Sequence, residues 1–370
     1  GMKSVLYTSV LQTPILLLGS LIILVLGFKE LGGWDEMMRV CGAVTVNDYG
    51  DTMTNLIRSN DDANFPWLGA LIGSAIIGFW YWCTDQFIVQ RVLSGKNEME
   101  ARRGTIFGAY LKLLPVFLFL IPGMIAFALH QKYIGAGGEG FLPMLENGTA
   151  NADAAFPTLV AKLLPAGVKG LVVCGILAAL MSSLASLFNS SAMLFTIDFY
   201  KRFRPQTSEK KLVGIGQVAT VVIVILGILW IPIMRSVGDV LYTYLQDVQS
   251  VLAPGIAAAF LLGICWKRTS AQGGMWGLIS GMVIGLTRLG AKVYYSNAGE
   301  VADSTFKYLF YDMNWLFFCG WMFLFCIIVV IVVSLATEAP TAEKIQGLVF
   351  GTATKEQKAS TRASWNHWDI

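Results

Sequence analysis

Blocks of twenty or more predominantly apolar residues recur along the chain, separated by polar segments. An α-helix needs about 20 such residues to cross the roughly 30 Å hydrocarbon core of a bilayer. Apolar and polar residues do not alternate as they do in the strands of a membrane barrel, and backbone amides in lipid need internal partners. The pattern therefore predicts an all-α polytopic membrane protein with about eight spanning helices, over residues 4–28, 66–92, 104–129, 167–199, 212–234, 240–266, 273–293 and 314–337.

Composition supports this class, because 55% of the residues are hydrophobic and only 14% are charged, far from the average of soluble domains. Residues 1–337 are expected to form the transmembrane helical bundle and residues 338–370 a polar cytoplasmic tail. The loops over 29–65 and 130–166 are long for a membrane bundle. We expect them to contain short surface helices.

The distribution of charge sets the orientation. Basic residues concentrate in loops 93–103, 200–211 and 267–272, whereas loops 29–65 and 294–313 lean acidic. Because cytoplasmic loops carry the excess of lysine and arginine, both termini are predicted to face the cytoplasm of a plasma (inner) membrane.

Other classes of chemistry find little support. Five of the six cysteines lie in apolar blocks, and the two histidines stand near no further ligand at zinc spacing, so neither a disulfide framework nor a zinc site is expected. No phosphate-binding loop, nucleophile elbow, catalytic triad or nucleic-acid patch is present. We expect no enzyme activity, no organic cofactor and no nucleic-acid partner.

One predicted span carries a carboxylate, Asp85. A carboxylate in hydrocarbon costs roughly 2.5–3.5 kcal/mol, so it persists where it faces a partner, a cavity or a pathway. Tyr81 lies four residues before Asp85 and shares its helix face, and Arg91 marks the cytoplasmic end of the span. Lys112, on the next span, lies at about the depth of Asp85, so the two charges are predicted to neutralise each other. Alternatively Lys112 extends to the cytoplasmic surface.

Three further features allow a site and a plain alternative. Ser182 and Ser183 offer oxygen ligands to an alkali cation, or belong to a stripe of small residues that packs helices closely. Gln246 can hydrogen-bond a polar solute, or it lies at a solvated helix end. Asp198 closes its span beside basic residues and is predicted to be an interfacial charge. The prolines at 115 and 122 predict a kink next to Lys112, which aims its ammonium inward or only shapes packing.

Long motifs resemble a known family. The runs 80–86, 88–91, 93–94, 96–97, 110–113, 122–125, 150–153, 178–184, 188–191, 195–198, 261–263 and 265–268, with Pro115 and Gln246, closely resemble the corresponding stretches of sodium/glucose cotransporters in the solute:sodium symporter family. The likeness extends to about residue 337.

The resemblance implies an inverted-repeat fold of five plus five helices and alternating access driven by a sodium gradient, with Na⁺ as the coupling ion. By the same resemblance, Tyr81 is the aromatic gate beneath a sugar, with Trp82 beside it. Lys112 and Gln246 look like hydroxyl-binding residues. The span-four half of the sodium site is then formed by Ala179, Ser182 and Ser183, with Asp85, Arg91 and Asp198 as supporting charges.

Two departures from the family pattern bear on function. Gly78 stands where relatives place a polar sugar-contacting residue. The chain also begins at the last helix of the first repeat, so the N-terminal spans of the same protein are expected as partners and this fragment is not expected to transport alone. The sequence predicts sodium-coupled symport of a glucose- or galactose-like sugar. Alternatives are symport of another polar solute (an inositol or a carboxylate) and a non-transporting membrane sensor or subunit.

Overall fold

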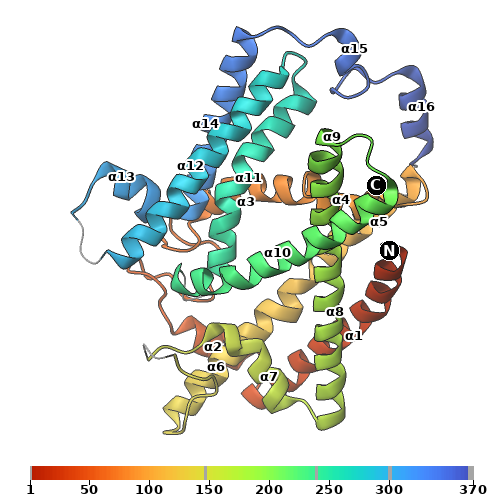
Figure 1. The fold of residues 1–370 in the computed structure, drawn as a ribbon. Coiled ribbons are helices and arrows are strands. Elements are labelled where there is room, and N and C mark those ends of the chain that lie inside the picture. The colour runs from red at the N-terminus through yellow and green to blue at the C-terminus, as the bar shows by residue number, and fades with distance from the viewer. Residues whose placement is uncertain (1, 146–147, 238–240, 299–301, 366–370) are drawn as a thin grey trace. The chain divides into compact units, whose positions relative to one another are not determined.

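The chain is helical throughout its regular structure. The computed structural model describes residues 2–145, 148–237, 241–298 and 302–365, and within these ranges extended structure is confined to isolated bridges. This confirms the predicted all-α class. The principal helices are α1 (Met2–Leu31), α3 (Trp67–Cys83), α4 (Gln86–Leu93), α5 (Glu98–Leu111), α6 (Ile121–Gly135), α8 (Ala166–Met193), α10 (Glu209–Val237), α11 (Leu241–Cys265), α12 (Ala271–Asn297) and α14 (Trp315–Ala336) (Figure 1).

The predicted spans correspond to these helices. Within the described ranges, six helices are long and apolar enough to cross a bilayer, and the bent pair α3–α4 makes a seventh. The predicted span 273–293 forms α12, which is not among them and carries Arg288 and Lys292. The long loops contain α2 (Trp34–Gly42), the 3₁₀ turn η2 (Ala152–Ala154) and α7 (Ala155–Leu163), so the predicted short helices are confirmed.

Three segments within the described ranges are π-helical. The π-helices are η1 (Val116–Leu120), η3 (Leu194–Tyr200) and η4 (Tyr308–Asp312). The short helices α9 (Lys201–Phe203) and α13 (Thr305–Lys307) adjoin η3 and η4. Because π-helical turns occur often at functional sites, η1 and η3 are candidate functional regions of the chain.

The first of two compact units comprises residues 1–56 and 108–232. Helix α1 packs against α6 and α8, and the core between them includes the fully buried Ile23, Ile125 and Leu129. Polar contacts fix the loop between α6 and α7. Nδ1 of His130 accepts a hydrogen bond from the Leu142 amide at 2.9 Å, and Nζ of Lys162 donates to the Phe141 carbonyl at 2.8 Å.

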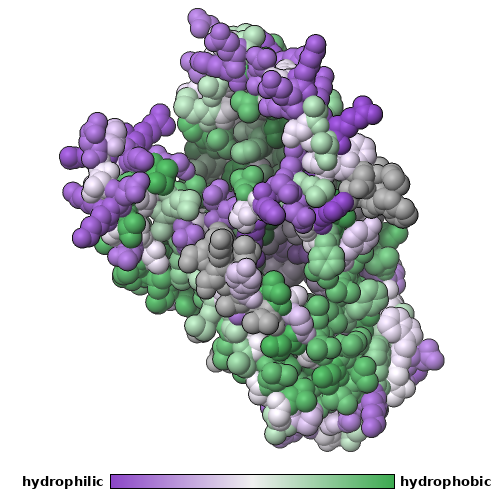
Figure 2. All heavy atoms as spheres, turned by 90° about the vertical axis from the view of Figure 1, so that its right-hand side faces the viewer, coloured by the Kyte–Doolittle hydropathy of each residue, from purple (hydrophilic) through white to green (hydrophobic). Residues whose placement is uncertain are grey.

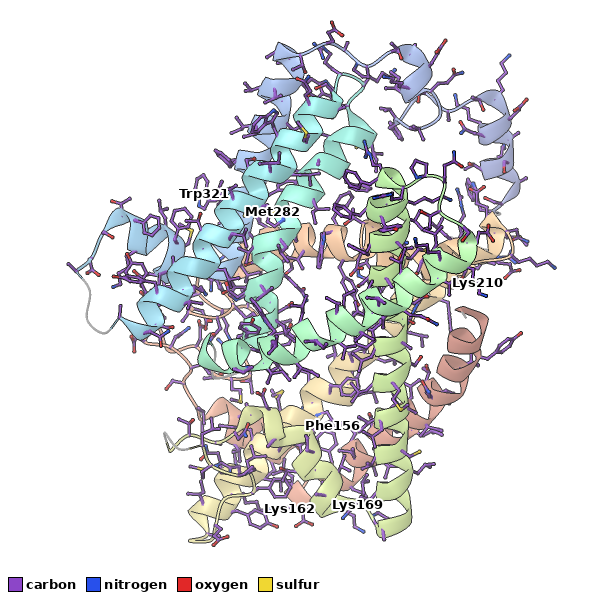
Figure 3. The ribbon with its side chains drawn as sticks, in the orientation of Figure 1. Phe156, Lys162, Lys169, Lys210, Met282 and Trp321 are labelled. Carbon is purple, nitrogen blue, oxygen red and sulfur yellow. The ribbon has the colours of Figure 1, made fainter. Side chains whose placement is uncertain are left out.

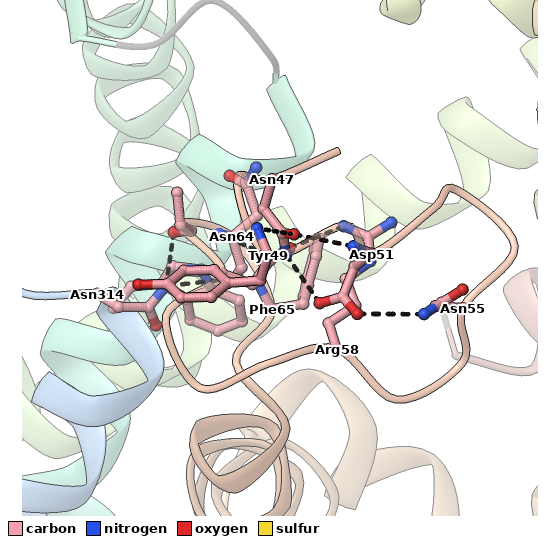
Figure 4. Close-up of polar contacts among 11 residues, drawn as sticks. Asn47, Tyr49, Asp51, Asn55, Arg58, Asn64, Phe65 and Asn314 are labelled. Atoms are coloured by element: carbon pink, nitrogen blue, oxygen red, sulfur yellow. Dashed lines mark hydrogen bonds and ion pairs between the residues drawn. The ribbon is translucent and has the colours of Figure 1, made fainter. Parts of the chain in front are cut away.

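The second unit comprises residues 57–107 and 233–370. In it α11, α12 and α14 pack side by side, and α3 packs against α11 and α14 (Figure 1). The amide of Asn314 donates to the Ala63 carbonyl at 2.7 Å and its oxygen caps α14 at Leu316 (Figure 4). These bonds fix the start of α14 against the loop that precedes α3.

The tail folds into two further short helices, α15 (Ala342–Ile345) and α16 (Lys355–Ala363). The Phe350 amide donates to the Ile264 carbonyl at 2.7 Å, and the Ser360 hydroxyl lies 3.4 Å from Oε2 of Glu98. The segment predicted as a polar tail therefore contacts the ends of α11 and α5.

Many apolar side chains point outward from the helices. Met282 of α12 and Trp321 of α14 are 59% and 63% exposed and point away from the helix cluster (Figure 3). Figure 2 shows broad apolar areas on the face that it displays. Helices that are apolar on their outward faces match a lipid environment.

Candidate functional site

Residues 80–91 form the break in a bent helix pair. Helix α3 ends at Cys83, α4 begins at Gln86, and their axes differ by 49°. The Thr84 hydroxyl donates to the Trp80 carbonyl at 2.7 Å, which satisfies one free acceptor at the end of α3. A helix broken at this depth leaves backbone groups that a solute, an ion or water can satisfy.

Asp85 is the N-cap of α4. Its Oδ1 accepts the backbone amide of Phe87 at 2.9 Å. A carboxylate at this position satisfies an unpaired amide and interacts favourably with the positive end of the helix. The sequence interpretation gave Asp85 only a charge-pairing role with Lys112 and missed this cap. Lys112 belongs to the other compact unit, so the pairing itself stays a prediction.

Aromatic rings cluster at the same break. Tyr81 is half-buried, with its ring centroid 6.3 Å from that of Trp80 and 5.5 Å from that of Trp82, which it meets edge-on. Trp82 is 43% exposed. The Arg91 guanidinium lies 4.4 Å from the centroid of the Phe87 ring, a cation–π contact. The break therefore carries amphipathic rings next to exposed helix ends.

Substitutions at Asp85 can separate capping from charge. We expect Asp85→Ala to destabilise the helix break by about 1 kcal/mol, because the Phe87 amide loses its acceptor. Asp85→Asn keeps an equally good cap and removes only the charge. The midpoint of thermal unfolding should therefore fall in the alanine variant and stay near that of the wild type in the asparagine variant. An equal fall in both variants would mean that the charge of Asp85, and not its cap, stabilises the break.

Lys112 also lies at a break. Helix α5 ends at Leu111, Lys112 and Leu113 form a turn, and η1 begins directly after Pro115. The amide of Lys112 still donates to the Gly108 carbonyl at 3.0 Å. The regular α-helix is therefore interrupted beside Lys112, and the kink expected from the two prolines stays a prediction. The direction of the Lys112 ammonium toward a solute stays a prediction.

The predicted sodium ligands lie together on α8. Ala179 and Ser182 are half-buried and Ser183 is exposed, all within about one helical turn. Hydroxyl oxygens of this kind are the hard ligands that alkali and alkaline-earth cations prefer. Asp198 lies further along, exposed in η3, and its role as an interfacial charge stays a prediction.

Gln246 lies on α11, where its Nε2 donates to the Tyr242 hydroxyl at 3.0 Å. Tyr242 is 56% exposed, so this end of the helix is open to solvent or solute. The neighbouring Asp247 is different. Only 9% of it is exposed, so the solvated helix end that the sequence allows for Gln246 does not extend to Asp247.

Asp247 belongs to a buried charge network that sequence reasoning missed. Its Oδ2 lies 2.6 Å from Nζ of Lys292 and its Oδ1 lies 3.4 Å from Nη2 of the fully buried Arg288. Arg288 also donates to the Met313 carbonyl at 2.8 Å and stacks 4.1 Å from the Phe318 ring centre. Two cations four residues apart in a predicted membrane span were the available signal.

The predicted site residues thus fall into two groups. Tyr81, Trp82, Asp85, Arg91 and Gln246 lie in one compact unit, and Lys112, Ala179, Ser182, Ser183 and Asp198 lie in the other. Their assembly into one site stays a prediction. Among the described residues, no group of three or more His, Cys, Asp or Glu side chains is arranged to hold a metal ion.

Comparison with known proteins identifies close relatives. The family model "Sodium:solute symporter family" matches residues 1–281. The sodium/myo-inositol cotransporter 2 of Homo sapiens is 36% identical over 363 residues, which cover 95% of this chain and 54% of that protein. The sodium/glucose cotransporter 1 of Ovis aries is 38% identical, over 91% of this chain and 53% of that protein.

A third relative, the sodium/glucose cotransporter 4 of Mus musculus, is 35% identical over 99% of this chain and 56% of its own length. The chain therefore spans about half the length of the curated relatives it matches. The multi-pass helical architecture, the motifs at the two helix breaks and the match over most of the chain agree. The chain belongs to the sodium:solute symporter family.

Proposed function

We propose that this chain supplies the central solute- and sodium-binding helices of a sodium-coupled symporter for a neutral, hydroxyl-rich solute. Its relatives are named as cotransporters of glucose, of mannose and of myo-inositol, all polyhydroxylated and uncharged molecules. The proposal covers the class of solute, because these relatives differ in the particular molecule.

One observation carries the proposal: three of the four predicted solute contacts lie at interruptions of membrane helices. Tyr81 and Trp82 end α3 at its break, and Lys112 lies in the turn between α5 and η1. Symporters bind solutes and ions where helices are discontinuous, since only there are backbone dipoles free in the membrane. A protein that merely packs its helices needs no such breaks.

The residues have distinct roles in this proposal. The Tyr81 ring forms the floor of the site, and Gln246 and Lys112 hydrogen-bond hydroxyl groups. The amide of Gln246 both donates and accepts, as a sugar hydroxyl requires, while the Lys112 ammonium donates only. Ser182 and Ser183 offer hydroxyl oxygens to Na⁺, and sodium bound there favours the conformation that accepts solute from outside, which couples the two fluxes.

Sodium-dependent uptake tests the proposal. The natural protein containing this chain, reconstituted in vesicles, should accumulate labelled glucose, galactose, mannose or myo-inositol under an inward sodium gradient. A preference for carboxylates would assign Lys112 to an anion instead. Sodium-dependent binding of a solute with no uptake would indicate a sensor, and neither binding nor uptake of any neutral polyol would refute the proposal.

The sodium ligands can be tested with matched serines. Ser182→Ala and Ser183→Ala should each raise the sodium concentration for half-maximal uptake roughly tenfold, because each removes an oxygen ligand worth about 1.4 kcal/mol. Ser186 lies on the same helix but is 1% exposed. Ser186→Ala should leave the sodium dependence unchanged. A uniform effect of all three would indicate a packing role for the serine stripe.

A further inference from the structure

An open cavity with a mainly apolar lining lies between α8 with η3 and α10, entirely within the first compact unit. Its volume is about 350 Å³, and its lining includes the polar side chains of Asn189, Thr196, Gln217 and Thr220. The rest of the lining is apolar side chains and Gly216, with no charged group. Four neutral polar groups from α8, η3 and α10 are thus gathered in a lining that is otherwise apolar.

Thr196 carries an unsatisfied hydroxyl. The residue is 5% exposed, and its Oγ1 is buried with no hydrogen-bond partner. Other helical threonines return their hydroxyl to the carbonyl four residues back: Thr105 to Ala101 at 2.8 Å, Thr220 to Gly216 at 3.0 Å and Thr287 to Val283 at 2.8 Å. A buried hydroxyl without a partner is unfavourable, so this one calls for a ligand.

The π-helix explains the difference. Thr196 is the third residue of η3, where the helix widens and the carbonyls shift from their α-helical positions. In this turn the Thr196 hydroxyl makes no bond to a carbonyl of its own helix, and it lies buried beneath the lining of the cavity. π-helical turns of this kind occur frequently at functional sites.

Gly216 keeps the opposite wall open. A methyl group at Gly216 would lie 3.4 Å from Oγ1 of Thr196, so any larger side chain there would fill the space in front of the hydroxyl. Gly214, two residues earlier on α10, has nothing within 4 Å of the same added atom. Only the first glycine borders the cavity.

The chemistry of the lining selects the ligand. Amides and hydroxyls donate and accept hydrogen bonds, and no charged group favours an ion. The volume is that of a small-molecule site rather than of a bare cation. We propose that the cavity between η3 and α10 is a second binding site for a neutral polyhydroxylated molecule, of the class transported.

This inference rests on the proposed function and extends it. Thr196 and Gln217 flank the basic loop 200–211, which the charge distribution places in the cytoplasm. The site therefore lies in the cytoplasmic third of the membrane, where a solute entering from or leaving to the cytoplasm can be held. Lys210, in the first turn of α10, lies at the end of the helix that follows this loop (Figure 3).

Photolabelling tests the site in the natural protein containing this chain, held in lipid nanodiscs with sodium. Diazirine derivatives of glucose and of myo-inositol should label peptides from residues 189–220, in competition with the unlabelled solute. The double substitution Thr196→Val with Gln217→Leu should lower that labelling roughly tenfold, and Gly216→Val should lower it as much by filling the cavity.

Controls separate this site from folding and from the proposed central site. Gly214→Val and Thr287→Val, which make the same chemical changes outside the cavity, should leave labelling intact. Competed labelling confined to segments near Tyr81, Lys112 and Gln246 would overturn the second site and leave the proposed function standing. Labelling of 189–220 that unlabelled solute does not displace also overturns it, and competed labelling nowhere overturns both proposals.

Discussion

Replacing Arg288 by methionine should destabilise the protein by roughly 3–5 kcal/mol, the cost of breaking a buried ionic group. The guanidinium is fully buried and connects three elements: Asp247 of α11, the Met313 carbonyl after η4 and the Phe318 ring of α14. Methionine fills similar space but donates no hydrogen bond. The variant would leave buried carbonyls unpaired and Asp247 with Lys292 alone.

Thermal unfolding in detergent measures this effect. We expect the apparent midpoint to fall on the order of 10 °C, at the few degrees per kcal/mol typical of this size. Lys307→Met is a suitable control, because Lys307 also holds an aspartate, Asp303, at 2.9 Å, but that carboxylate is 95% exposed. The hydrogen bond from Lys307 lowers the pKa of Asp303, yet solvent screens the pair, so little change is expected.

A double-mutant cycle distinguishes a network from independent contacts. Asp247→Leu alone leaves the buried Arg288 and the partly buried Lys292 close together without a counter-charge, so it should be as damaging as Arg288→Met. The pair of substitutions should cost less than the sum of the two. If the two changes in unfolding free energy simply add, or if the Arg288→Met protein is as stable as wild type, the network does not act as a unit that stabilises the fold.

Gln246 gives this network a functional consequence. Asp247 is the next residue in the chain, and its carboxylate pairs with Arg288 and Lys292 of α12. The N-terminal part of α11 is thereby held against α12, while the Gln246 amide is bonded to the exposed Tyr242 hydroxyl. In the proposed function Gln246 contacts the solute, and a contact held by a rigid element costs less entropy on binding.

The approximate positions of the helices were predictable from the sequence, because the apolar runs are about as long as a helix that crosses a bilayer. The prolines indicated an irregular helix beside Lys112, whereas the break at Asp85 falls inside the predicted span 66–92, which was expected to be continuous. The cap made by Asp85 was not inferred, since a carboxylate inside an apolar run suggests a partner charge before it suggests a helix start. Such a start needs a preceding helix end, here at Cys83.

The buried network and the cavity at Thr196 could not be derived from one sequence. Arg288 and Lys292 are evident as charges, but which helix faces them depends on the packing of α11, α12 and α14. The orphan hydroxyl of Thr196 depends on the π-helical turn, and no local residue pattern in 194–200 distinguishes a π-helix from an α-helix. Both features come from tertiary structure.

Substituting alanine for glycine at two positions of α12 should change stability in opposite directions. Gly273, Gly277, Gly281 and Gly285 are buried at intervals of four and form one face against α11 and α14. A methyl group at Gly285 would lie 2.5 Å from the Val251 carbonyl oxygen, and one at Gly281 would lie 2.9 Å from the Gly255 Cα. Backbone atoms cannot rotate away, so the helices must separate.

We therefore expect Gly285→Ala to destabilise the protein by about 1–3 kcal/mol, the usual range for overpacking. Gly290→Ala lies on the same helix with nothing within 4 Å of the added atom, and alanine is about 1 kcal/mol the better helix former. Its unfolding midpoint should rise. Because both variants make the same chemical change, the difference between them isolates helix contact; a rise in both would mean that α11 and α12 do not approach as closely as the structure shows.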